Sequence, residues 1–476
     1  MFVPNGTHVT KAKVVRLEQI RLLGKIGKNK MRKMKNSGIE WIGEIPEDWE
    51  VCKIKHILST DKDNLKVGPF GSQLSGTDFS TEGYWVYNQR TVLDYNFETN
   101  NTYVNYIKYE EMQGFQVREN DILITTRGTI GKIARVPKCF KKGILHPCII
   151  KFRIDDTKYD YNLLEIIFND SNLLKLQIDY ESNATTIDVI YGYTLKNLVL
   201  PFPPLHEQQK IIDFLDKKCS EIDSVISKTR ETIEEYKKLK QSIITEVVTG
   251  KVKIENGKVC GKYDTYKDSG VEWIGEIPSE WDCFYLSQIF SPVKNKNIGK
   301  QETNLLSLSY GKIIRKNIET TFGLLPENFE GYNIIERDNI VLRLTDLQND
   351  HKSLRVGLVT EKGIITSAYL TLKNKTNMSS NYFYYLLHSF DIAKGFYGMG
   401  AGVRQGLNWN EIRSLRIISP KNVPEQQRIA DFLDKKCSEI DKLITKKEQL
   451  VIELESYKKS LIYEVVTGKK ECNLIE

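Results

Sequence analysis

The stretch EQQKIIDFLDKKCSEIDSVI, which begins at Glu207, decides the fold because it recurs as EQQRIADFLDKKCSEIDKLI from Glu425. The block DFLDKKCSEID is identical in both copies, and the second copy follows the first by 218 residues. A second pair repeats further out: NSGIEWIGEIPEDWE from Asn36 returns as DSGVEWIGEIPSEWD from Asp268, 232 residues later. Self-similarity at a fixed period means that one structural unit is built twice.

The sequence between the repeated segments is not conserved between the copies. Residues 51–200 and 283–418 align poorly, and the two offsets differ by 14 residues. A duplicated framework with two different inserts indicates one task performed on two different targets. The expected organisation is a basic, disordered extension at 1–35, globular domain 1 at 36–200, helix 1 at 201–251, a linker at 252–267, globular domain 2 at 268–418, helix 2 at 419–469 and a tail at 470–476.

The repeated segments that follow Pro204 and Pro424 are predicted to be long helices. About 43 residues run without glycine or proline until Gly250 and Gly468, and proline before and glycine after are the expected boundaries of a helix. Apolar residues recur every seven positions, which is typical of a coiled coil. The predicted seam consists of Leu215, Ile222, Val225, Tyr236, Ile243, Leu433, Ile440, Leu443, Leu454 and Leu461.

The two helices are expected to pair with each other in antiparallel orientation. At 1.5 Å per residue each is about 65 Å long, which suits a spacer between two globular heads. The apolar rows together are wider than one partner helix covers, so a further partner is expected to dock there. A coiled coil that only dimerises the protein is the alternative.

The inserts alternate short apolar runs with turns, as in NDILITTRGTIGKIARV from Asn120 and DNIVLRLTDLQ from Asp338. Such runs predict strands, and each insert ends in a helical segment. The expected fold class is therefore α+β: two α+β domains with mixed sheets, separated by two long antiparallel coiled-coil helices.

Composition restricts the function only loosely. The formal charge is +7, from 69 basic and 62 acidic residues, which is compatible with a polyanionic partner but does not require one. The eight cysteines form no C-x-x-C pair and lack clustered histidines, so we expect no zinc site and reduced thiols in a cytoplasm. No run approaches the roughly 20 apolar residues of a membrane-spanning helix.

The first 35 residues hold ten lysines and arginines and one acid, Glu18. We expect a disordered extension, with Met31 or Met34 as the working start. A basic arm that grips phosphate is the alternative.

Two motifs imitate catalytic sites. GMGAG from Gly398 resembles the glycine-rich turn of a methyltransferase, but a helical stretch precedes it where a strand is needed. Pro424–Glu425 followed by Asp434–Lys436 resembles the acid pair of a nuclease. Acids nine positions apart on one helix are about 13 Å apart, too far to share a Mg²⁺ ion. A phosphate-binding loop is absent as well, so we assign no catalytic residue and no metal ligand.

Loops rich in glycine, arginine, lysine, threonine, asparagine and glutamine can hold DNA phosphates and read base edges. Six such loops occur, three in each insert, although each is also compatible with an ordinary hairpin turn. The candidate DNA-binding residues are Gly68, Phe70, Gly71, Ser72, Gln73, Gln89, Arg90, Thr126, Arg127, Thr129, Lys132, Tyr310, Lys312, Arg315, Arg343, Thr345, Asp346, Arg404 and Gln405.

Taken together, these segments resemble the specificity subunits of type I restriction–modification systems over nearly the whole chain. The resemblance is carried by SGIEWIGEIPEDW, GPFGSQL, NDILITTRGTIGK, LPFPPLHEQQKIIDFLDKKCSEID and VVTGK, and by SGVEWIGEIP, SLSYGKIIRK, RLTDLQND, GMGAGVRQG and PEQQRIADFLDKK. The second helix departs from the pattern, since ISPKNVPEQQ replaces the LPFPPL lead-in, and its start is less well defined.

The resemblance implies two target-recognition domains, each reading one half of a split site in double-stranded DNA, and helices that set the spacing. It further implies two methyltransferase subunits docked on the helices and motor-nuclease subunits joined to them. S-adenosylmethionine, ATP and Mg²⁺ would belong to those partners, and this chain would itself be non-catalytic.

Two other classes of protein stay open at this point. A single-chain restriction and methylation enzyme would need the catalytic motifs that are missing here. A coiled-coil scaffold with sugar- or protein-binding heads would share the architecture but would not bind DNA.

Overall fold

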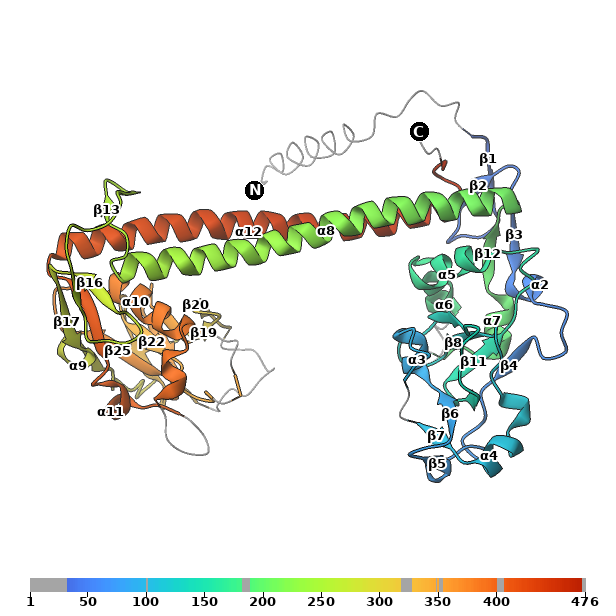
Figure 1. Ribbon diagram of the computed structural model, residues 1–476, viewed down its shortest axis with the longest axis horizontal. Coiled ribbons are helices and arrows are strands. Elements are labelled where there is room, and N and C mark those ends of the chain that lie inside the picture. Colours follow the sequence, from blue (N-terminus) through green and yellow to red (C-terminus); the bar gives the residue numbers. More distant parts are fainter. Residues whose placement is uncertain are drawn as a thin grey trace, which may run out of the picture. The chain divides into compact units, whose positions relative to one another are not determined.

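The computed structural model describes residues 32–99, 102–181, 189–317, 328–347, 349–350, 354–399 and 406–472. Within them the chain forms two compact units (Figure 1). Unit 1 comprises the chain up to Ile226 and again from Ile452 onward, and unit 2 comprises Ser227–Val451. Each unit therefore contains part of both long helices.

The long helices are α8 (Leu205–Val248) and α12 (Val423–Val466), of 44 residues each. Two residues after each helix lies a glycine with a positive φ, 70° at Gly250 and 71° at Gly468. The left-handed conformation of the glycine turns the chain so that the following N–H can reach a carbonyl of the last helical turn. After α8, the N–H of Lys251 donates to the carbonyl of Glu246 at 2.8 Å. The structure confirms the two predicted helices.

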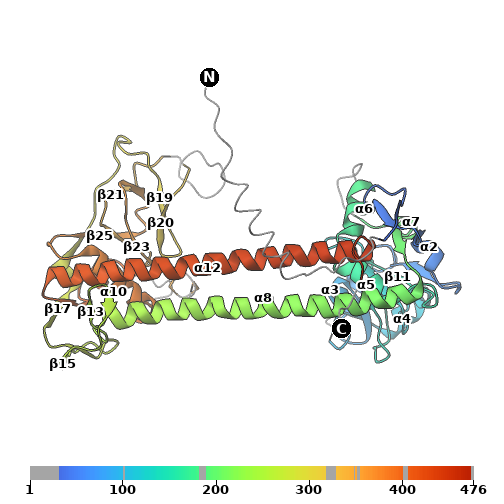
Figure 2. The ribbon, with the colours of Figure 1, turned by 90° about the horizontal axis from the view of Figure 1, so that it is seen from above.

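Within each unit the helix segments run antiparallel and side by side (Figures 1 and 2). In unit 2, Ile233 packs with Ile440 and Ile444, and further along α8 the Lys240 ammonium lies 2.7 Å from the Asp441 carboxylate. Later residues of α8 thus meet earlier residues of α12. In unit 1 the Lys458 ammonium lies 2.6 Å from Asp223.

Most of the predicted seam residues are buried or half-buried, but two of them are exposed. Val225 and Leu443 are 47% and 42% exposed, whereas Leu215 and Leu433 are buried. A helix of 3.6 residues per turn drifts by about 20° per heptad, so a row beside the seam rotates out of reach of the partner helix. The buried members of a neighbouring row are Ile226, Ile233, Val247, Cys437, Ile444, Val451 and Val465, of which Ile233 and Ile444 pack together. Of the other predicted seam residues, Ile222, Ile440 and Leu461 are buried, and Tyr236, Ile243 and Leu454 are half-buried.

The central sheet has the same strand order in both units, and every pairing in it is antiparallel. In unit 1 the order is β4 (Leu65–Val67), β11 (Ile149–Phe152), β8 (Ile122–Thr125) and β9 (Ile133–Arg135). In unit 2 the order is β18 (Phe290–Pro292), β25 (Leu370–Asn374), β22 (Ile340–Leu342) and β23 (Val356–Leu358). Two poorly alignable sequences thus build one α+β fold, as predicted.

The outer sheets differ between the units. Unit 1 has β10 (Gly143–Leu145), β6 (Tyr84–Tyr87), β7 (Tyr103–Val104) and β5 (Phe79–Ser80), with β10 parallel to β6. Unit 2 has the hairpin β19 (Leu306–Ser309) and β20 (Lys312–Arg315) and the pair β21 (Asn333–Ile335) and β24 (Gly363–Ile365), both antiparallel. A mixed sheet was expected in both domains, but the named strand pairs described in unit 2 are all antiparallel.

Shorter elements complete each unit. Unit 1 adds β1 (Met34–Asn36), β2 (Glu44–Pro46), β3 (Glu50–Lys53), α2 (Ile54–Ile57), η1 (Gly76–Asp78), α3 (Gln89–Leu93), α4 (Tyr106–Glu111), η2 (Gln113–Phe115), α5 (Tyr161–Asn169), α6 (Leu173–Glu181), α7 (Gly192–Asn197) and β12 (Val199–Phe202). Unit 2 adds β13 (Ile254–Glu255), β14 (Lys258–Val259), β15 (Tyr266–Asp268), β16 (Glu276–Pro278), β17 (Trp281–Tyr285), α9 (Leu286–Ile289), α10 (Ser380–Ile392), η3 (Gly395–Gly398), α11 (Trp409–Ile412) and β26 (Arg416–Pro420).

Each unit joins the start of one long helix to the end of the other. In unit 1, Trp49 donates its indole N–H to Glu207 of α8 at 2.7 Å. Gly468, just after α12, lies so close to Pro46 that a Cβ there would be 2.4 Å from the Pro46 ring. The repeated residues of unit 2 make the same two contacts, Trp281 with Glu425 and Pro278 with Gly250.

Two predicted boundaries are wrong. Arg32 belongs to unit 1, because its guanidinium binds both Asp48 and Glu207, and β1 begins at Met34. The predicted linker belongs to unit 2, where Ile254 is buried in the core and Tyr263 donates to Glu425 at 2.7 Å. In both places the contacts come from residues distant in sequence, which spacing alone does not indicate.

Replacing Leu215 or Leu433 with alanine should lower the free energy of unfolding by about 2–5 kcal/mol each, because both side chains are buried. Val225→Ala and Leu443→Ala are matched controls on the exposed row. They should change the free energy of unfolding by no more than about 0.5 kcal/mol. Urea unfolding followed by circular dichroism measures both. Equal losses in all four variants would show that the seam is misassigned.

Candidate nucleic-acid interface

In unit 1 two candidate loops lie against each other. The hairpin between β8 and β9 is closed by Thr125, whose N–H donates to the carbonyl of Lys132 at 3.0 Å. The Gln89 side chain, at the start of α3, reaches the carbonyl of Thr129 at 3.4 Å. The structure therefore brings Gln89–Arg90 and Arg127–Thr129 together at one edge of the central sheet.

The third candidate loop of unit 1, which begins at Gly68, is connected to these two loops through the turn at residues 146–149. Gly68 donates to the carbonyl of Ile149 at 2.9 Å, and a Cβ on Gly68 would lie 2.3 Å from the carbonyl oxygen of His146, so only glycine fits. The same turn accepts the N–H of Thr126 at the Cys148 carbonyl. Phe70, two residues after Gly68, is 75% exposed. Gly71, Ser72 and Gln73 follow it on the surface.

The charge at this edge is positive. The guanidinium groups of Arg90 and Arg127 are exposed and have no partner among the residues that the structure describes. Burial lowers the pKa of His146, so its imidazole is neutral at pH 7. Two unpaired arginines beside glycine-rich backbone suit a phosphate-bearing partner.

Two candidates of unit 1 are engaged inside the fold. Thr126 is buried and donates its hydroxyl to the Cys148 carbonyl at 3.0 Å, and the Lys132 ammonium donates to the carbonyl of Asn169. Neither side chain is free to contact a ligand in this arrangement. Their role here is to hold the hairpin that presents Arg127.

In unit 2 the loop after β22 is held from inside by Arg355. This arginine is fully buried and donates to the carbonyls of Arg343 at 3.0 Å, Thr345 at 2.8 Å and Asp350 at 2.5 Å. Its backbone N–H donates to Asp391 at 2.7 Å. Burial raises the pKa of that carboxyl, and the hydrogen bond and charge of Arg355 partly offset the rise.

The sequence did not point to Arg355, since an isolated arginine next to a strand is usually a surface residue. The loop that it organises carries the candidates Arg343, Thr345 and Asp346, of which Thr345 and Asp346 are exposed. Arg343 lies 3.5 Å from the Asp350 carboxylate. This ion pair weakens the case for Arg343 as a free phosphate ligand.

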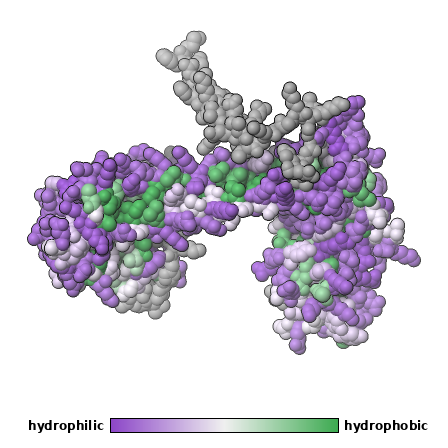
Figure 3. All heavy atoms as spheres, turned by 45° about the horizontal axis from the view of Figure 1, so that its top comes forward, coloured by the Kyte–Doolittle hydropathy of each residue, from purple (hydrophilic) through white to green (hydrophobic). Residues whose placement is uncertain are grey.

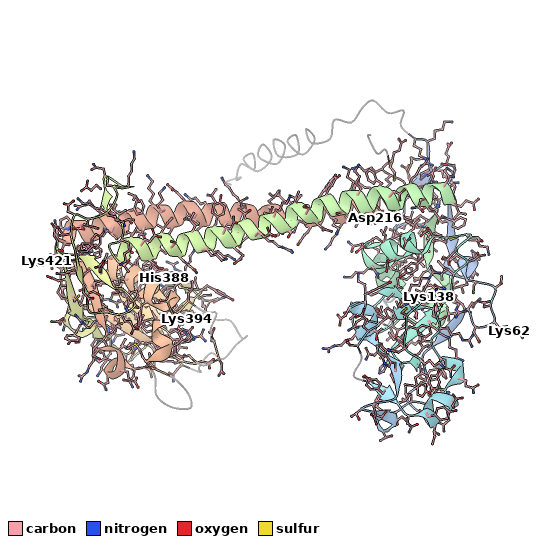
Figure 4. All side chains as sticks on the ribbon, in the orientation of Figure 1. Lys62, Lys138, Asp216, His388, Lys394 and Lys421 are labelled. Atoms are coloured by element: carbon pink, nitrogen blue, oxygen red, sulfur yellow. The ribbon has the colours of Figure 1, made fainter. Side chains whose placement is uncertain are left out.

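Three further candidates of unit 2, Tyr310, Lys312 and Arg315, lie on the β19–β20 hairpin. Tyr310 and Lys312 line a cavity of about 690 Å³ together with Lys240, Asp441 and His388. The Lys312 ammonium lies 3.6 Å from Asp441, and His388, labelled in Figure 4, comes from α10. Burial and the nearby Lys240 lower the pKa of His388 to about 4.

The remaining candidates are either paired with an acidic side chain or lie outside the described residues. Arg315 is bound to Glu361, so its charge is neutralised locally. Arg404 and Gln405 lie outside the described residues, as does most of the GMGAG segment. The predicted basic residues of unit 2 are therefore mostly paired, in contrast to those of unit 1.

The acids that imitate a nuclease site have other partners. Glu425 accepts from Trp281 and Tyr263, and Asp434 accepts from Tyr385 and Asn381 at 2.7 Å. Among the residues described, no group of His, Cys, Asp and Glu is arranged to hold a metal ion. In the same part of the chain, no helix is long and apolar enough to cross a membrane.

Comparisons with known proteins agree on one family. A model described as the type I restriction modification DNA specificity domain matches residues 46–235 and 278–454. A Methanocaldococcus jannaschii protein assigned as the MjaX specificity subunit of a type I restriction enzyme is 25% identical over 442 residues, covering 90% of this chain and 95% of its own.

Two solved structures share the fold. One chain, from work on complex assembly and conformational transition of the type I R-M system, has a TM-score of 0.63 at 13% identity and covers 90% of this chain and 99% of its own. The HsdS subunit from Thermoanaerobacter tengcongensis has a TM-score of 0.50 at 12% identity, covering 90% and 98%.

Replacing Arg355 with methionine should destabilise unit 2 by about 3–5 kcal/mol, because three loop carbonyls lose their buried donor and the Asp391 carboxylate loses a nearby positive charge. The control Arg343→Met removes only a half-buried ion pair and should cost less than about 1 kcal/mol. Urea unfolding measures both, and hydrogen exchange should show faster exchange of the amides at 344–347 in the Arg355 variant. Unchanged exchange there would contradict the positioning role.

Proposed function

The chain belongs to the family of type I restriction modification DNA specificity domains, and on that premise we propose that it selects the DNA sites on which partner enzymes act. Unit 1 reads one half of a bipartite site and unit 2 reads the other. The observation that carries the proposal is the identical strand order of the two central sheets, which present loops of unlike sequence. One framework with two sets of loops suits two half-sites of different sequence.

In unit 1 we assign phosphate contacts to Arg90 and Arg127, which have no other partner among the described residues. Base contacts come from the polar side chains beside them, the half-buried Gln89 and the exposed Thr129, Ser72 and Gln73. In unit 2 the corresponding surface is the loop with Thr345 and Asp346. Because the arginines there are paired with acids, recognition by unit 2 depends more on hydrogen bonds than on charge.

The two long helices set the distance between the half-sites in this proposal. Each is continuous through residues of both units, and 44 residues correspond to about 66 Å of helix. In this proposal the length of the helices determines the number of base pairs between the half-sites, which a flexible linker would leave undefined.

The same helices are proposed to dock two methyltransferase subunits. Large apolar side chains remain exposed along them, and Figure 3 shows apolar surface gathered there. They include Val225, Ile452 and Tyr457 in unit 1, and Leu239, Leu443 and Leu450 in unit 2. Exposed apolar rows of this kind are typical of surfaces that bind another helix.

In this proposal the partner subunits, and not this chain, catalyse the reactions on DNA. The methyltransferase subunits bring S-adenosylmethionine, and motor-nuclease subunits bring ATP and Mg²⁺. The complex acts on chromosomal and invading DNA in the cytoplasm.

Methylation mapping tests the function. The full chain is co-expressed with a methyltransferase subunit of the same restriction system, and the host DNA is sequenced for methylated adenines. We expect a split motif with an unspecified gap, lost when this chain is omitted. An assembled complex that adds no methylation would overturn the proposal.

Exchange of one insert tests the division of labour. Replacing residues 51–200 by the corresponding region of another family member should change one half of the motif and leave the other half and the gap unchanged. The reciprocal exchange of residues 283–418 is the matched control and should change only the second half. A change in both halves after one exchange would contradict the two-unit reading.

A further inference from the structure

A short segment at the edge of the unit 1 sheet was not among the predicted sites. Ile190 donates its backbone N–H to the carbonyl of Thr126 at 3.1 Å, which fixes the segment at the end of β8 beside the Arg127 hairpin. α7 begins directly afterwards, with Tyr191 as its N-cap residue. Gly192 lies against Val67 at the end of β4, where a Cβ would be 3.0 Å from the Val67 Cγ2 atom.

Two tyrosines stand on this segment and face outward. Tyr191 and Tyr193, the tyrosine pair, are 55% and 70% exposed, and their rings stack with centroids 5.9 Å apart and an interplanar angle of 10°. Folding gains little from rings left this exposed. Large exposed apolar surface beside a binding loop indicates a contact with a partner.

The electrostatics of the surroundings favour DNA as that partner. Residues 64–77, 122–154 and 189–206 meet here through the β4–β11–β8 pairing and the contact of α7 with β4. These three segments contain no acidic residue. Of their basic residues, Arg135, Lys151 and Arg153 form ion pairs with acids just outside these segments. The basic residues with no acidic partner among the described residues are Lys66, Arg127, Lys132, Lys138, Lys141, Lys142 and Lys196.

Unit 2 has a different pair of side chains at the same place in the fold. Leu407 donates its N–H to the carbonyl of Leu344 at 2.9 Å, just after β22, and α11 follows with Asn408 as its N-cap residue. β8 and β22 hold the same position in the two sheets, so Tyr191 corresponds to Asn408 and Tyr193 to Asn410. The Asn408 side chain caps the helix by accepting from the Asn410 N–H. The exposed Asn410 amide has no partner among the described residues.

We propose that this N-terminal turn carries specificity-determining residues in both units, a deduction that rests on the proposed function. The tyrosine pair contacts thymine methyl groups in the major groove of one half-site. Asn410 binds an adenine of the other half-site through its side-chain amide. An apolar ring matches the thymine methyl, and an amide matches the donor and acceptor of the adenine edge.

The test uses the full chain purified in complex with its methyltransferase subunits, after the motif of that complex has been mapped. Binding is measured by fluorescence anisotropy on duplexes that carry the motif with deoxyuridine in place of thymine, one half-site at a time. Deoxyuridine keeps base pairing and removes only the methyl group. Unmodified complex should lose about fivefold to tenfold in affinity when one half-site is substituted.

The double variant Y191A/Y193A should bind the thymine duplex about as weakly as unmodified complex binds the deoxyuridine duplex, with no further loss on substitution. Y191F/Y193F keeps the rings and should behave like the unmodified complex. Asn410→Ala should relax the preference for adenine in the other half-site by about tenfold and leave the first half-site unchanged. Tyr95→Ala is the matched control: it is 54% exposed in the same unit but carries no assigned base contact, and it should have no effect.

An unmodified complex that shows no preference for any bipartite motif would overturn the proposed function itself. If the motif is found but Y191A/Y193A keeps its sensitivity to deoxyuridine, or loses affinity equally for all sequences, the tyrosine contact is refuted and the proposed function stands. Thermal melting confirms that each variant is folded, as expected for exposed positions.

Discussion

The contact between a tryptophan, a glutamate and the end of the opposite helix constrains the whole structure. In unit 1, Trp49 donates to Glu207 at the start of α8 and shares its site with Gly468 at the end of α12. The same arrangement occurs in unit 2 with the helices exchanged. The start of one helix and the end of the other must therefore meet in each unit, which forces the pair to run antiparallel. This explains why the repeated residues lie at the ends of the helices and around the tryptophans.

A framework fixed in this way leaves the inserts free to diverge. The central sheet needs only buried aliphatic side chains in a fixed strand order, and many sequences meet that requirement. What stays constant is backbone: the carbonyls of Thr126 and Leu344 accept equivalent N–H groups in the two units. Side chains at the neighbouring positions are then free to change from tyrosine to asparagine without disturbing the fold. Variation in specificity and constancy of architecture follow from one arrangement.

Sequence predicted the repeat, both helices and the α+β class, because periodicity and boundary residues are local signals. It did not predict that Val225 is exposed, since this depends on where the helix surface rotates away from the partner helix. The sequence also suggested more unpaired basic side chains in unit 2 than its described residues contain. The acid that neutralises Arg315 is Glu361, and that pairing exists only after β20 meets β23. Arg355 was missed because its burial is a tertiary property.

Charge pairing makes the two units unequal, although they share a fold. Unit 1 presents Arg90 and Arg127 without internal partners among the described residues, so its affinity should derive largely from phosphate contacts and counterion release. In unit 2 the loop after β22 is held rigid by Arg355, and its basic neighbours are already paired. A rigid, nearly neutral loop gains little affinity from phosphates but discriminates well between hydrogen-bonding patterns. In the proposed function, phosphate contacts therefore weigh more in unit 1 than in unit 2, while side chains of both units read bases. The difference comes from the ion pairs of the described residues and does not require different folds.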